Sequence, residues 1–580
     1  MEAYRTEIVM GPVEHQEPYG GKLVQLVVDE DRKALLKEVS FKLSDITLNE
    51  RQLCDLELLA TGAFSPLDGF MVRSDYEAVL DRMRLQDETP WPVPICLDIS
   101  DNRSKSLEVG QSVALRDQEG FLLAIMHIED MWPVDKDKEA DLIYGTRARS
   151  HPSVNYLYGK SGGCYVGGNL EVVNLPIHPD FTALRQTPEE VRALYRKLGW
   201  KEVAGFQTRQ PIHRPQYEMT LQTMRREKVN LLISAVVGPT MPGDFDRYTR
   251  VRCCREAIKK YPPGTFALNL LPLAMRMAGP RAALLHSIIS KNYGCTHFIV
   301  GSGHANPGKC SNGNFFYADD IASELATKFS DEIGIKIVPF KKMVYLSFED
   351  EYRSLDQVPE GTQTVSLSGA QICRRIRTGR NIPGWATFPE VELELEKSYP
   401  PPLKQGVTVF ITGLSGAGKS TIAKILYAKF LEIGDRPVTL LDGDIVRLNL
   451  SSELNFSKEH RDINVRRIGF VASEITKNRG IAICAPIAPY ETTRAEIRQL
   501  IEEHGGFVEV HVSTPIEECE KRDRKGMYAK ARAGLIKGFT GVDDPYEIPE
   551  TPEVRIDTTN ITPDEAVQEI LLYLGHVGFI

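Results

Sequence analysis

The chain changes its pattern of apolar and polar residues near residue 187. Before this point, short apolar runs such as Lys22-Leu-Val-Gln-Leu-Val-Val28 and Ser112-Val-Ala-Leu115 are separated by turn-forming residues. After it, Pro188–Lys197 has helical spacing and Leu231–Val237 is a continuous apolar run. The first pattern predicts a β-rich N-terminal domain, and the second predicts an α/β domain with a parallel sheet.

Two further stretches suggest where ligands bind and where domains meet. Thr296–Val300 indicates a strand that leads into the glycine-containing loop Gly301–Gly308, and open α/β sheets bind ligands at such loops. Pro400-Pro-Pro402 and the polar residues after it indicate a linker. We therefore expect domains at residues 1–170, 171–330, 331–390 and 405–580, with a linker at 391–404.

The most specific local signal is Gly413-Leu-Ser-Gly-Ala-Gly-Lys-Ser420, which matches the G-x-x-x-x-G-K-[ST] phosphate-binding loop. Val407–Ile411 predicts a buried strand before it, and Thr421–Leu431 has helical spacing after it. In such a loop, backbone N–H groups point at phosphate oxygens and the helix N-terminus adds partial positive charge. We expect Lys419 to reach the β- and γ-phosphates of ATP and Ser420 to ligate Mg²⁺.

A second apolar strand, Val438–Leu441, is followed by the carboxylates Asp442 and Asp444. Carboxylates at the end of a strand beside a phosphate loop can ligate Mg²⁺ or accept a proton from an attacking hydroxyl. Asp444 is the first candidate for the base and Asp442 for the metal-side carboxylate, although the two roles can be exchanged. An aspartate that only caps the following helix is the alternative.

Composition and charge narrow the class of protein. With 580 residues, 42% of them hydrophobic and 26% charged, the chain has the composition of a multidomain globular protein. A net charge of -9 predicts neither a nucleic-acid nor a membrane surface. The ten cysteines form no C-x-x-C pair, which predicts reduced thiols. Without a recognisable signal peptide or membrane-spanning run, we expect a cytoplasmic enzyme.

Residues 405–580 resemble adenylylsulfate (APS) kinase, the enzyme that phosphorylates the 3′-hydroxyl of APS. The resemblance rests on the phosphate loop, on Asp442 and Asp444 with Arg447, and on further motifs in the same order. These motifs are Asn455–Gly469, Ile487–Tyr490 with Arg494, Cys519–Tyr528 and Ala531–Gly541. The family implies a P-loop kinase with a parallel sheet that makes 3′-phosphoadenylyl sulfate (PAPS) and ADP, with Mg²⁺ as cofactor.

The resemblance also implies the residues of each subsite. ATP is expected at Gly413, Leu414, Ser415, Gly416, Ala417, Gly418, Lys419, Ser420, Thr421, Arg522 and Lys525. APS is expected at Arg447, Phe456, Arg461, Asn464, Arg467, Ile487, Lys537 and Phe539. The two phenylalanines suit stacking on the adenine of APS, and the arginines suit its phosphosulfate. Mg²⁺ is expected at Ser420 and Asp442, and catalysis at Lys419, Asp442 and Asp444.

Residues 1–390 resemble ATP sulfurylase, which makes APS and pyrophosphate from ATP and sulfate. The resemblance rests on Gly62–Phe70, Gln207-Thr-Arg209, Met275–Arg281 and Gly294–Gly301. It implies a PUA-like N-terminal domain, a nucleotidyltransferase-like α/β domain and a small α/β subdomain. Members of both families self-associate, so a homo-oligomer, either a dimer or a hexamer, is expected.

The sulfurylase-like part departs from its family at functional positions. The residues of this degenerate site are Gln207, Arg209, His213, Gln216, Met241, Ser302 and Gly303. Gln216 stands where the family has the second histidine of an H-x-x-H pair, and Met241 replaces a lysine. Ser302 and Gly303 replace an arginine and an aspartate. Because glutamine cannot carry positive charge, we expect sulfurylase activity to be absent or very weak.

The sequence leaves alternatives open. A fully bifunctional PAPS synthase is one, in which Gln216 and shifted side chains suffice for sulfurylase chemistry. In another, the front part is a regulatory or oligomerisation module that senses a nucleotide. A third, a P-loop kinase for a different nucleotide, is disfavoured by Phe456, Phe539 and the arginines available for a second anion. The preferred interpretation is an APS kinase behind a sulfurylase-like region that has lost its activity.

Overall fold

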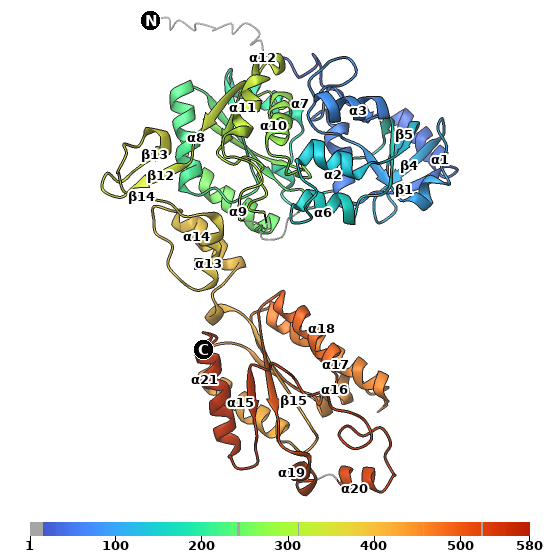
Figure 1. The fold of residues 1–580 in the computed structure, drawn as a ribbon, viewed down its shortest axis with the longest axis vertical. Helices are drawn as coiled ribbons and strands as arrows, with labels where there is room; N and C mark the ends of the chain where they lie inside the picture. The colour runs from blue at the N-terminus through green and yellow to red at the C-terminus, as the bar shows by residue number, and fades with distance from the viewer. Residues whose placement is uncertain (1–15, 240–243, 311–312, 456, 524–525) are drawn as a thin grey trace, which may run out of the picture. The chain divides into compact units, whose positions relative to one another are not determined.

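The computed structural model describes residues 16–239, 244–310, 313–455, 457–523 and 526–580 (Figure 1). The side chains of Ala370 and Asp444 are not part of this description. The chain divides into two compact units: the first extends to Gln371 and includes Ile382–Leu395, and the second comprises Ile372–Asn381 and Glu396–Ile580. Separate clusters of buried apolar side chains form the cores of these units.

The first unit begins with a mixed six-stranded sheet, in the order β1-β4-β5-β6-β2 with β3 paired to β6. Its strands are β1 (Ser44–Thr47), β2 (Gly69–Phe70), β3 (Leu97–Ile99), β4 (Ser112–Arg116), β5 (Leu122–Pro133) and β6 (Cys164–Val172). The accompanying helices include α1 (Glu30–Ser40), α2 (Glu50–Ala60), α3 (Arg73–Arg82), α5 (Lys136–Glu139) and α6 (Pro152–Gly159). The β-rich N-terminal domain predicted from the sequence is therefore present, with helices packed around its sheet (Figure 1).

One of the two apolar runs expected to form strands does not do so. Ser112–Leu115 lies within β4, as predicted, but Lys22–Val28 contains only an isolated bridge between Val27 and Val172. Backbone hydrogen bonds of this run go to different elements, because Leu26 N donates to the carbonyl of Ala60, at the end of α2, and Val28 N donates to β6. Without one neighbouring strand along its length, the run cannot form a ladder.

A parallel five-stranded sheet follows in the first unit, in the order β11-β10-β7-β8-β9, as the alternating pattern predicted. Its strands are β7 (Val203–Thr208), β8 (Asn230–Val236), β9 (Phe266–Leu271), β10 (His297–Gly301) and β11 (Lys336–Phe340). Its helices are α7 (Pro188–Leu198), α8 (Arg214–Glu227), α9 (Arg247–Ile258), α10 (Pro280–Asn292), α11 (Ile321–Lys328) and α12 (Ser330–Ile333). Helix α7 begins where predicted because Thr187 and Glu190 form a capping box before its first turn.

A small antiparallel sheet comes next, in the order β13-β12-β14. Its strands are β12 (Met343–Leu346), β13 (Glu351–Ser354) and β14 (Thr364–Val365), followed by α13 (Gly369–Arg377) and α14 (Pro389–Ser398). Helix α14 runs through the first part of the stretch expected to be a linker. The limits of the domains and of the linker remain predictions.

The second unit has a parallel sheet in the order β16-β17-β15-β18-β19. Its strands are β15 (Val407–Gly413), β16 (Val438–Asp442), β17 (Ile481–Ala485), β18 (Gly506–Val512) and β19 (Val554–Ile556). Its helices include α15 (Lys419–Ile433), α16 (Gly443–Leu450), α17 (Lys458–Lys477), α18 (Glu491–Glu502), α19 (Ile516–Lys521), α20 (Met527–Arg532) and α21 (Pro563–His576). This is the parallel-sheet P-loop domain expected from the sequence.

Side chains of this sheet alternate between two cores. Val407, Val409 and Ile411 of β15 pack with residues of α15 and α21, whereas Phe410 packs with residues of α17 and α18. Figure 1 shows these two pairs of helices on opposite sides of the sheet. Because the strand is covered on both faces, all of its residues are buried, including Thr408 and Thr412.

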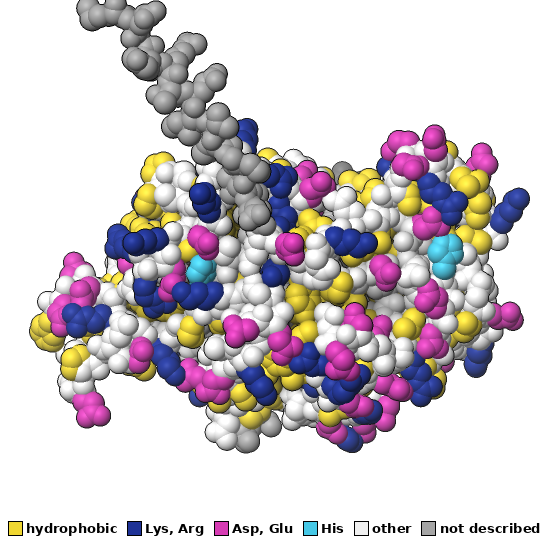
Figure 2. All heavy atoms as spheres, turned by 90° about the horizontal axis from the view of Figure 1, so that it is seen from above, with side chains coloured by type: hydrophobic (Ala, Val, Ile, Leu, Met, Phe, Trp, Pro, Cys, Tyr) yellow, Lys and Arg dark blue, Asp and Glu magenta, His cyan; other side chains and the backbone are white. Residues whose placement is uncertain are grey.

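The surface carries charges of both signs (Figure 2), and the cysteines form no disulfide among the described residues. Lys and Arg side chains are interspersed with Asp and Glu on the face displayed in Figure 2. All ten cysteines are free thiols in the structure. Within the described ranges, no helix combines the length and apolarity needed to cross a membrane.

Candidate active sites

The phosphate loop connects β15 to α15, which begins at Lys419. Gly413 and Gly416 have φ angles of 147° and 76°, a region that favours glycine. A Cβ atom on Gly413 would lie 2.5 Å from the carbonyl oxygen of Val512, and one on Gly416 would lie 2.8 Å from that of Cys519. The glycines therefore permit both the curvature of the loop and its close approach to neighbouring backbone.

Two carbonyl groups of the loop accept hydrogen bonds from side chains. Lys419 Nζ donates to the carbonyl of Leu414 at 2.7 Å, and its side chain is buried. The Tyr528 hydroxyl donates to the carbonyl of Ser415 at 2.9 Å. The bond to Leu414 holds the Lys419 ammonium group inside the loop, where a phosphate-binding lysine is needed.

Two hydrogen-bonded residues, Arg522 and Thr558, hold the phosphate loop at Ala417. Arg522 donates to the hydroxyl and the carbonyl of Thr558 at 2.7 and 2.8 Å, and the Thr558 hydroxyl bonds the carbonyl of Ala417 at 3.0 Å. Ser420 and Thr421, at the start of α15, are exposed and therefore accessible to a ligand. Lys525, the other basic residue expected at ATP, lies outside the described residues.

The two candidate carboxylates belong to different elements. Asp442 ends β16 and is 8% exposed, whereas Asp444 lies in the first turn of α16. Since β16, β17 and β15 are parallel neighbours, the end of β16 lies at the same edge of the sheet as the phosphate loop. This arrangement brings Asp442 to the expected edge, and the orientation of the Asp444 side chain is outside the described structure.

Arg461 anchors the segment that carries Phe539. From α17, its guanidinium donates to the carbonyl of Gly538 at 3.0 Å and to the Thr540 hydroxyl at 2.7 Å. The same group forms an ion pair with Asp544 at 2.7 Å, and both side chains are largely buried. A planar guanidinium can satisfy several acceptors at once, so Arg461 fixes the shape of this segment.

Arg447 and Arg467 hold another segment, between α16 and α17. Arg447 donates to the carbonyls of Leu454 and Asn455 at 3.3 and 3.1 Å. Arg467 donates to the carbonyl of Leu450 at 2.6 Å and pairs with Glu453 at 2.7 Å. Phe456, which continues this segment, lies outside the described residues. The two arginines therefore support the chain next to the predicted adenine-stacking position.

The other residues expected at APS differ in exposure. Asn464 is 5% exposed, and its Oδ1 lacks a hydrogen-bond partner among the described residues. Such a buried orphan acceptor is costly unless a ligand or water satisfies it. Ile487 accepts a hydrogen bond at its carbonyl from the Thr412 hydroxyl at 2.6 Å, and Lys537 is exposed. Phe539 packs partly against the core formed with α15.

Sequence reasoning missed two residues that organise this site, Tyr528 and Asp544. Tyr528 was visible as the last residue of the Cys519–Tyr528 motif, but its partner in the phosphate loop is a backbone carbonyl. Asp544 lies 83 residues from its partner Arg461, and no local pattern marks the pair. Arg494, in contrast, is 1% exposed and paired with Glu509 at 3.0 Å, so its role is structural.

In the sulfurylase-like region, Gln207 and Arg209 lie at the end of β7 and in the loop after it. Gln207 Nε2 donates to the carbonyl of His286 at 3.1 Å, and its Oε1 is a buried atom without a partner among the described residues. Arg209 pairs with Asp244 at 2.6 Å, and Gln210 donates to the same carboxylate at 2.9 Å. The charge of Arg209 is therefore compensated by a protein carboxylate.

His213 and Gln216 lie at the N-terminus of α8. His213 is 4% exposed, its Nδ1 bonds the Thr387 hydroxyl at 2.9 Å, and desolvation lowers its pKa to about 4. Gln216 Oε1 accepts a hydrogen bond from His213 N at 3.2 Å and so caps the helix. His213 is therefore neutral at physiological pH. Gln216 Oε1 stabilises the first turn of α8.

The loop after β10 carries Ser302 and Gly303. Gly303 has φ 66°, and its N–H donates to the carbonyl of Asp319 at 3.0 Å. The next residue, His304, bonds His286 at 2.8 Å between ring nitrogens, and burial lowers the pKa of both imidazoles, that of His304 to about 4. Met241, the remaining position of this site, lies outside the described residues. The histidines beside this loop are therefore neutral.

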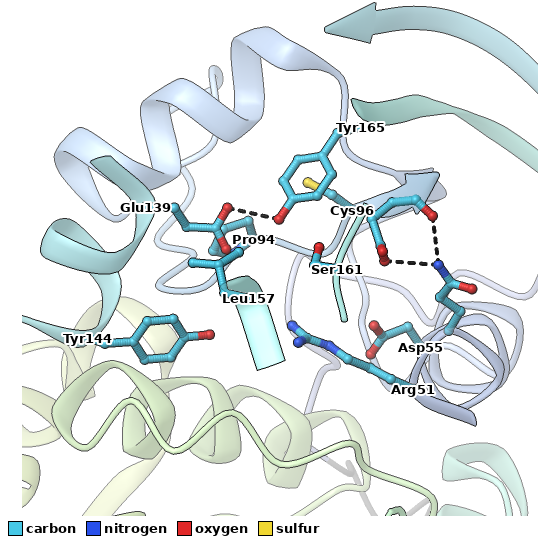
Figure 3. Close-up of a pocket in the computed structure, with 11 residues that line it drawn as sticks. Arg51, Asp55, Pro94, Cys96, Glu139, Tyr144, Leu157, Ser161 and Tyr165 are labelled. Atoms are coloured by element: carbon cyan, nitrogen blue, oxygen red, sulfur yellow. Dashed lines mark hydrogen bonds between the residues drawn. The ribbon is translucent and has the colours of Figure 1, made fainter. Parts of the chain in front are cut away.

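A small cavity lies in the N-terminal part of the first unit (Figure 3). Its volume is about 20 Å³, enough for one water molecule, and none of the expected site residues lines it. Arg51 and Asp55 line one side, and Glu139 accepts a hydrogen bond from Tyr165 on the other. Asp55 also pairs with Arg276 at 2.6 Å, and both side chains are 2% exposed. Arg276, from the Met275–Arg281 motif, thus joins the α/β domain to α2.

Three family models match consecutive parts of the chain. Family models match residues 16–175 as a PUA-like domain, 182–398 as ATP-sulfurylase and 405–557 as adenylylsulphate kinase. The chain is 48% identical to a sulfate adenylyltransferase from Mycosarcoma maydis, covering 96% of this chain and 98% of that protein. A sulfate adenylyltransferase from Aspergillus oryzae is also 48% identical, covering 97% of this chain and 99% of that protein.

A solved structure is similar over nearly the same length. It is described as a hexameric APS kinase from Thiobacillus denitrificans, with 41% identity and a TM-score of 0.79. The match covers 98% of this chain and all of that chain. The chain therefore belongs to the sulfate adenylyltransferase family, with a PUA-like domain, an ATP-sulfurylase domain and a C-terminal adenylylsulphate kinase domain.

Proposed function

We propose that this protein is an APS kinase, which transfers the γ-phosphoryl group of ATP to the 3′-hydroxyl of APS to give PAPS and ADP. The observation that carries the proposal is the phosphate loop with buried Lys419 and buried Asp442 at the same sheet edge. The similar solved structure described as an APS kinase supports it. The fixed segment around Phe539 supplies a second subsite beside the loop.

Ser420 and Asp442 offer oxygen atoms of the kind that Mg²⁺ binds. Among the described residues, no group of three or more His, Cys, Asp and Glu side chains could hold a metal. In phosphoryl-transfer sites, Mg²⁺ is held by one or two protein oxygen ligands together with phosphates and waters. The exposed Ser420 hydroxyl and the Asp442 carboxylate can supply those oxygens. When bound, Mg²⁺ neutralises charge on the β- and γ-phosphates.

Lys419, the loop N–H groups and Asp444 perform the remaining work. Lys419 places its charge beside the transferred phosphoryl group, and the N-terminus of α15 adds partial positive charge. Asp444 accepts the proton of the 3′-hydroxyl as that oxygen attacks the γ-phosphorus of ATP. The bond from the γ-phosphorus to the bridging oxygen of ADP breaks in line, and ADP leaves. Arg522, which is already fixed by Thr558, extends the cationic surface on the ATP side. Asp442 and Asp444 can exchange the roles of metal-side carboxylate and base.

APS binds beside Phe539 in this proposal. Phe539 stacks on its adenine together with Phe456, and Asn464 uses its orphan oxygen as an acceptor for the base or sugar. Arg447 and Lys537 lie on segments around this subsite and supply positive charge toward the phosphosulfate. Arg461 and Arg467, which pair with Asp544 and Glu453, hold those segments in place. Ile487, whose carbonyl bonds β15, forms part of the apolar wall.

The proposed base is tested by Asp444→Asn. The amide keeps the size of the side chain but cannot accept the proton, so we expect kcat to fall at least about 100-fold. Asp435→Asn is the matched control, because Asp435 is exposed and precedes the other end of β16. ADP formation with APS is measured for both variants. Unchanged turnover of Asp444→Asn would remove this residue from the base role and leave Asp442 as the candidate.

The proposal assigns very weak or absent ATP sulfurylase activity to the first unit. His213 has a depressed pKa, Gln216 caps α8, and the charge of Arg209 is compensated by Asp244. These groups offer little positive charge to the developing phosphate charge of adenylyl transfer. Ser302 adds no charge where the family has an arginine.

Full bifunctionality is the second candidate function. The relatives named sulfate adenylyltransferase favour it, because they match over almost the whole chain at close to half identity. A nucleotide-sensing or oligomerisation role for the first unit is the third. Saturable binding of ATP, APS or PAPS to the full chain at a second site, besides the kinase site, would support a sensor.

We also infer a homo-oligomer and a cytoplasmic location. The similar solved structure is described as hexameric, which supports self-association of this chain. Ten free thiols suit a reducing compartment. Sedimentation at working protein concentration tests the oligomer, and a monomer would contradict it.

A further inference from the structure

Tyr528 connects the phosphate loop to the segment that carries Phe539. Its hydroxyl donates to the carbonyl of Ser415 at 2.9 Å. The centre of its ring lies 5.0 Å from that of Phe539, with the two planes at 78°, which is an edge-to-face contact. The Tyr528 side chain is 2% exposed, so both contacts are shielded from water. One side chain therefore touches a predicted ATP residue and a predicted APS residue.

A second contact joins the same two segments without Tyr528. A Cβ atom on Gly541 would lie 2.9 Å from Leu414 Cδ2, so the backbone of Gly541 packs against the side chain of this phosphate-loop residue. Arg461 holds this segment through Gly538 and Thr540, so it is constrained on two sides. The segment around Phe539 therefore contacts the phosphate loop twice, through the Leu414 side chain and through Tyr528.

We propose that Tyr528 is a positioning residue that couples the ATP and APS sites energetically. The proposal rests on the proposed function, because it takes Ser415 as part of the ATP site and Phe539 as part of the APS site. Phosphates bound by the loop N–H groups fix the peptide planes of the loop, including the carbonyl that Tyr528 bonds. Through its ring, Tyr528 then fixes the face that Phe539 presents to the adenine of APS.

Coupling of this kind is reciprocal. If a nucleotide in the loop changes the affinity for APS by some factor, APS changes the affinity for the nucleotide by the same factor. The quantity to measure is the ratio of the APS dissociation constants with and without a non-hydrolysable ATP analogue and Mg²⁺. A residue that only stabilised the fold would change both constants together and leave the ratio alone.

Tyr528→Phe is the decisive variant, since it removes the bond to Ser415 and keeps the ring against Phe539. In the parent protein we expect the ratio to differ from one by about fivefold or more, and in Tyr528→Phe to fall within about twofold of one. Calorimetric titration of the full-length protein gives both constants. Tyr573→Phe, in α21, is the matched control and should keep the parent ratio.

Phe539→Leu tests the other end of the connection. It keeps the Tyr528 hydroxyl bond and removes the aromatic contact, so its ratio should also approach one. If thermal unfolding shows that Tyr528→Phe does not fold, the ratio of APS dissociation constants in Phe539→Leu tests the coupling instead. A parent ratio of one, or a Tyr528→Phe or Phe539→Leu ratio equal to the parent's, overturns the coupling. Absence of phosphoryl transfer from ATP to APS in the parent would instead overturn the proposed function.

Discussion

His213 and Gln216 illustrate how single residues lose or keep a chemical role through their surroundings. His213 is packed where desolvation favours its neutral form, and its Nε2 has no hydrogen-bond partner among the described residues. Gln216 Oε1 accepts a hydrogen bond from the backbone N–H of His213, and its amide group carries no charge. Neither residue supplies positive charge, which is why we infer weak sulfurylase chemistry.

The buried His213 predicts a dependence of stability on pH. In the unfolded chain its pKa is about 6.5, whereas in the folded protein it is about 4. Between these values the unfolded state binds more protons, so the free energy of unfolding falls as the pH drops. His213→Asn removes this contribution. The loss of stability between pH 7 and pH 5 should therefore be smaller in the variant, by about 2 kcal/mol.

Denaturant unfolding of both proteins at the two pH values checks this prediction. His151, His286, His304 and His511 also have lowered pKa values, but they are common to both proteins and cancel in the comparison. His504→Asn, at an exposed position, is the control and should behave like the parent. Equal pH dependence in His213→Asn and the parent would contradict the assignment of His213 as a buried neutral histidine.

At the scale of elements, the signals that predicted structure correctly were local. The strand, loop and helix around Gly413–Ser420 follow from glycine positions and apolar spacing within a few turns of chain. The run Lys22–Val28 misled because its backbone partners lie on two separate elements, which no local pattern reveals.

Contacts between distant residues could not be predicted from the sequence. Arg276 and Asp55 are 221 residues apart, and Arg461 and Asp544 are 83 apart. The partner of each arginine depends on the completed fold, because several carboxylates of equal local character were available. The residues of the candidate site therefore remain predictions from the sequence, whereas the contacts between them required the structure.

Helix α21 provides a prediction about a single element. Thr562 and Glu565 form a capping box at its N-terminus, with Glu565 N bonded to the Thr562 hydroxyl at 3.2 Å. Thr562→Ala removes the acceptor, and we expect a loss of about 1 kcal/mol and a midpoint lower by about 2–4 °C. The affected transition should be the one that ADP raises, because α21 packs on α15, the helix that follows the phosphate loop.

Scanning calorimetry with and without ADP and Mg²⁺ measures both effects. Thr559→Ala is the matched control, since Thr559 precedes the helix without capping it, and its change should stay within about 0.5 kcal/mol. If Thr562→Ala lowered only a transition that ADP does not affect, α21 would not share a cooperative unit with the nucleotide site.

At the scale of the whole molecule, two units with separate cores carry two family resemblances. In the second unit, the loop, the carboxylate at the sheet edge and the fixed segment around Phe539 are assembled from described contacts. In the first unit, His213 has a lowered pKa and Arg209 pairs with Asp244, and Gln216 is uncharged. Low positive charge in this site is the observation behind the proposal of weak sulfurylase activity.

The most direct test is a pair of assays on the purified full-length protein. One supplies APS with Mg²⁺ and ATP and measures ADP and PAPS. The other supplies sulfate with ATP and pyrophosphatase and measures pyrophosphate release against an active ATP sulfurylase. We expect sustained PAPS formation and pyrophosphate release at or near the level of the blank. Pyrophosphate release comparable to that of the active sulfurylase, or no PAPS formation, would contradict the account.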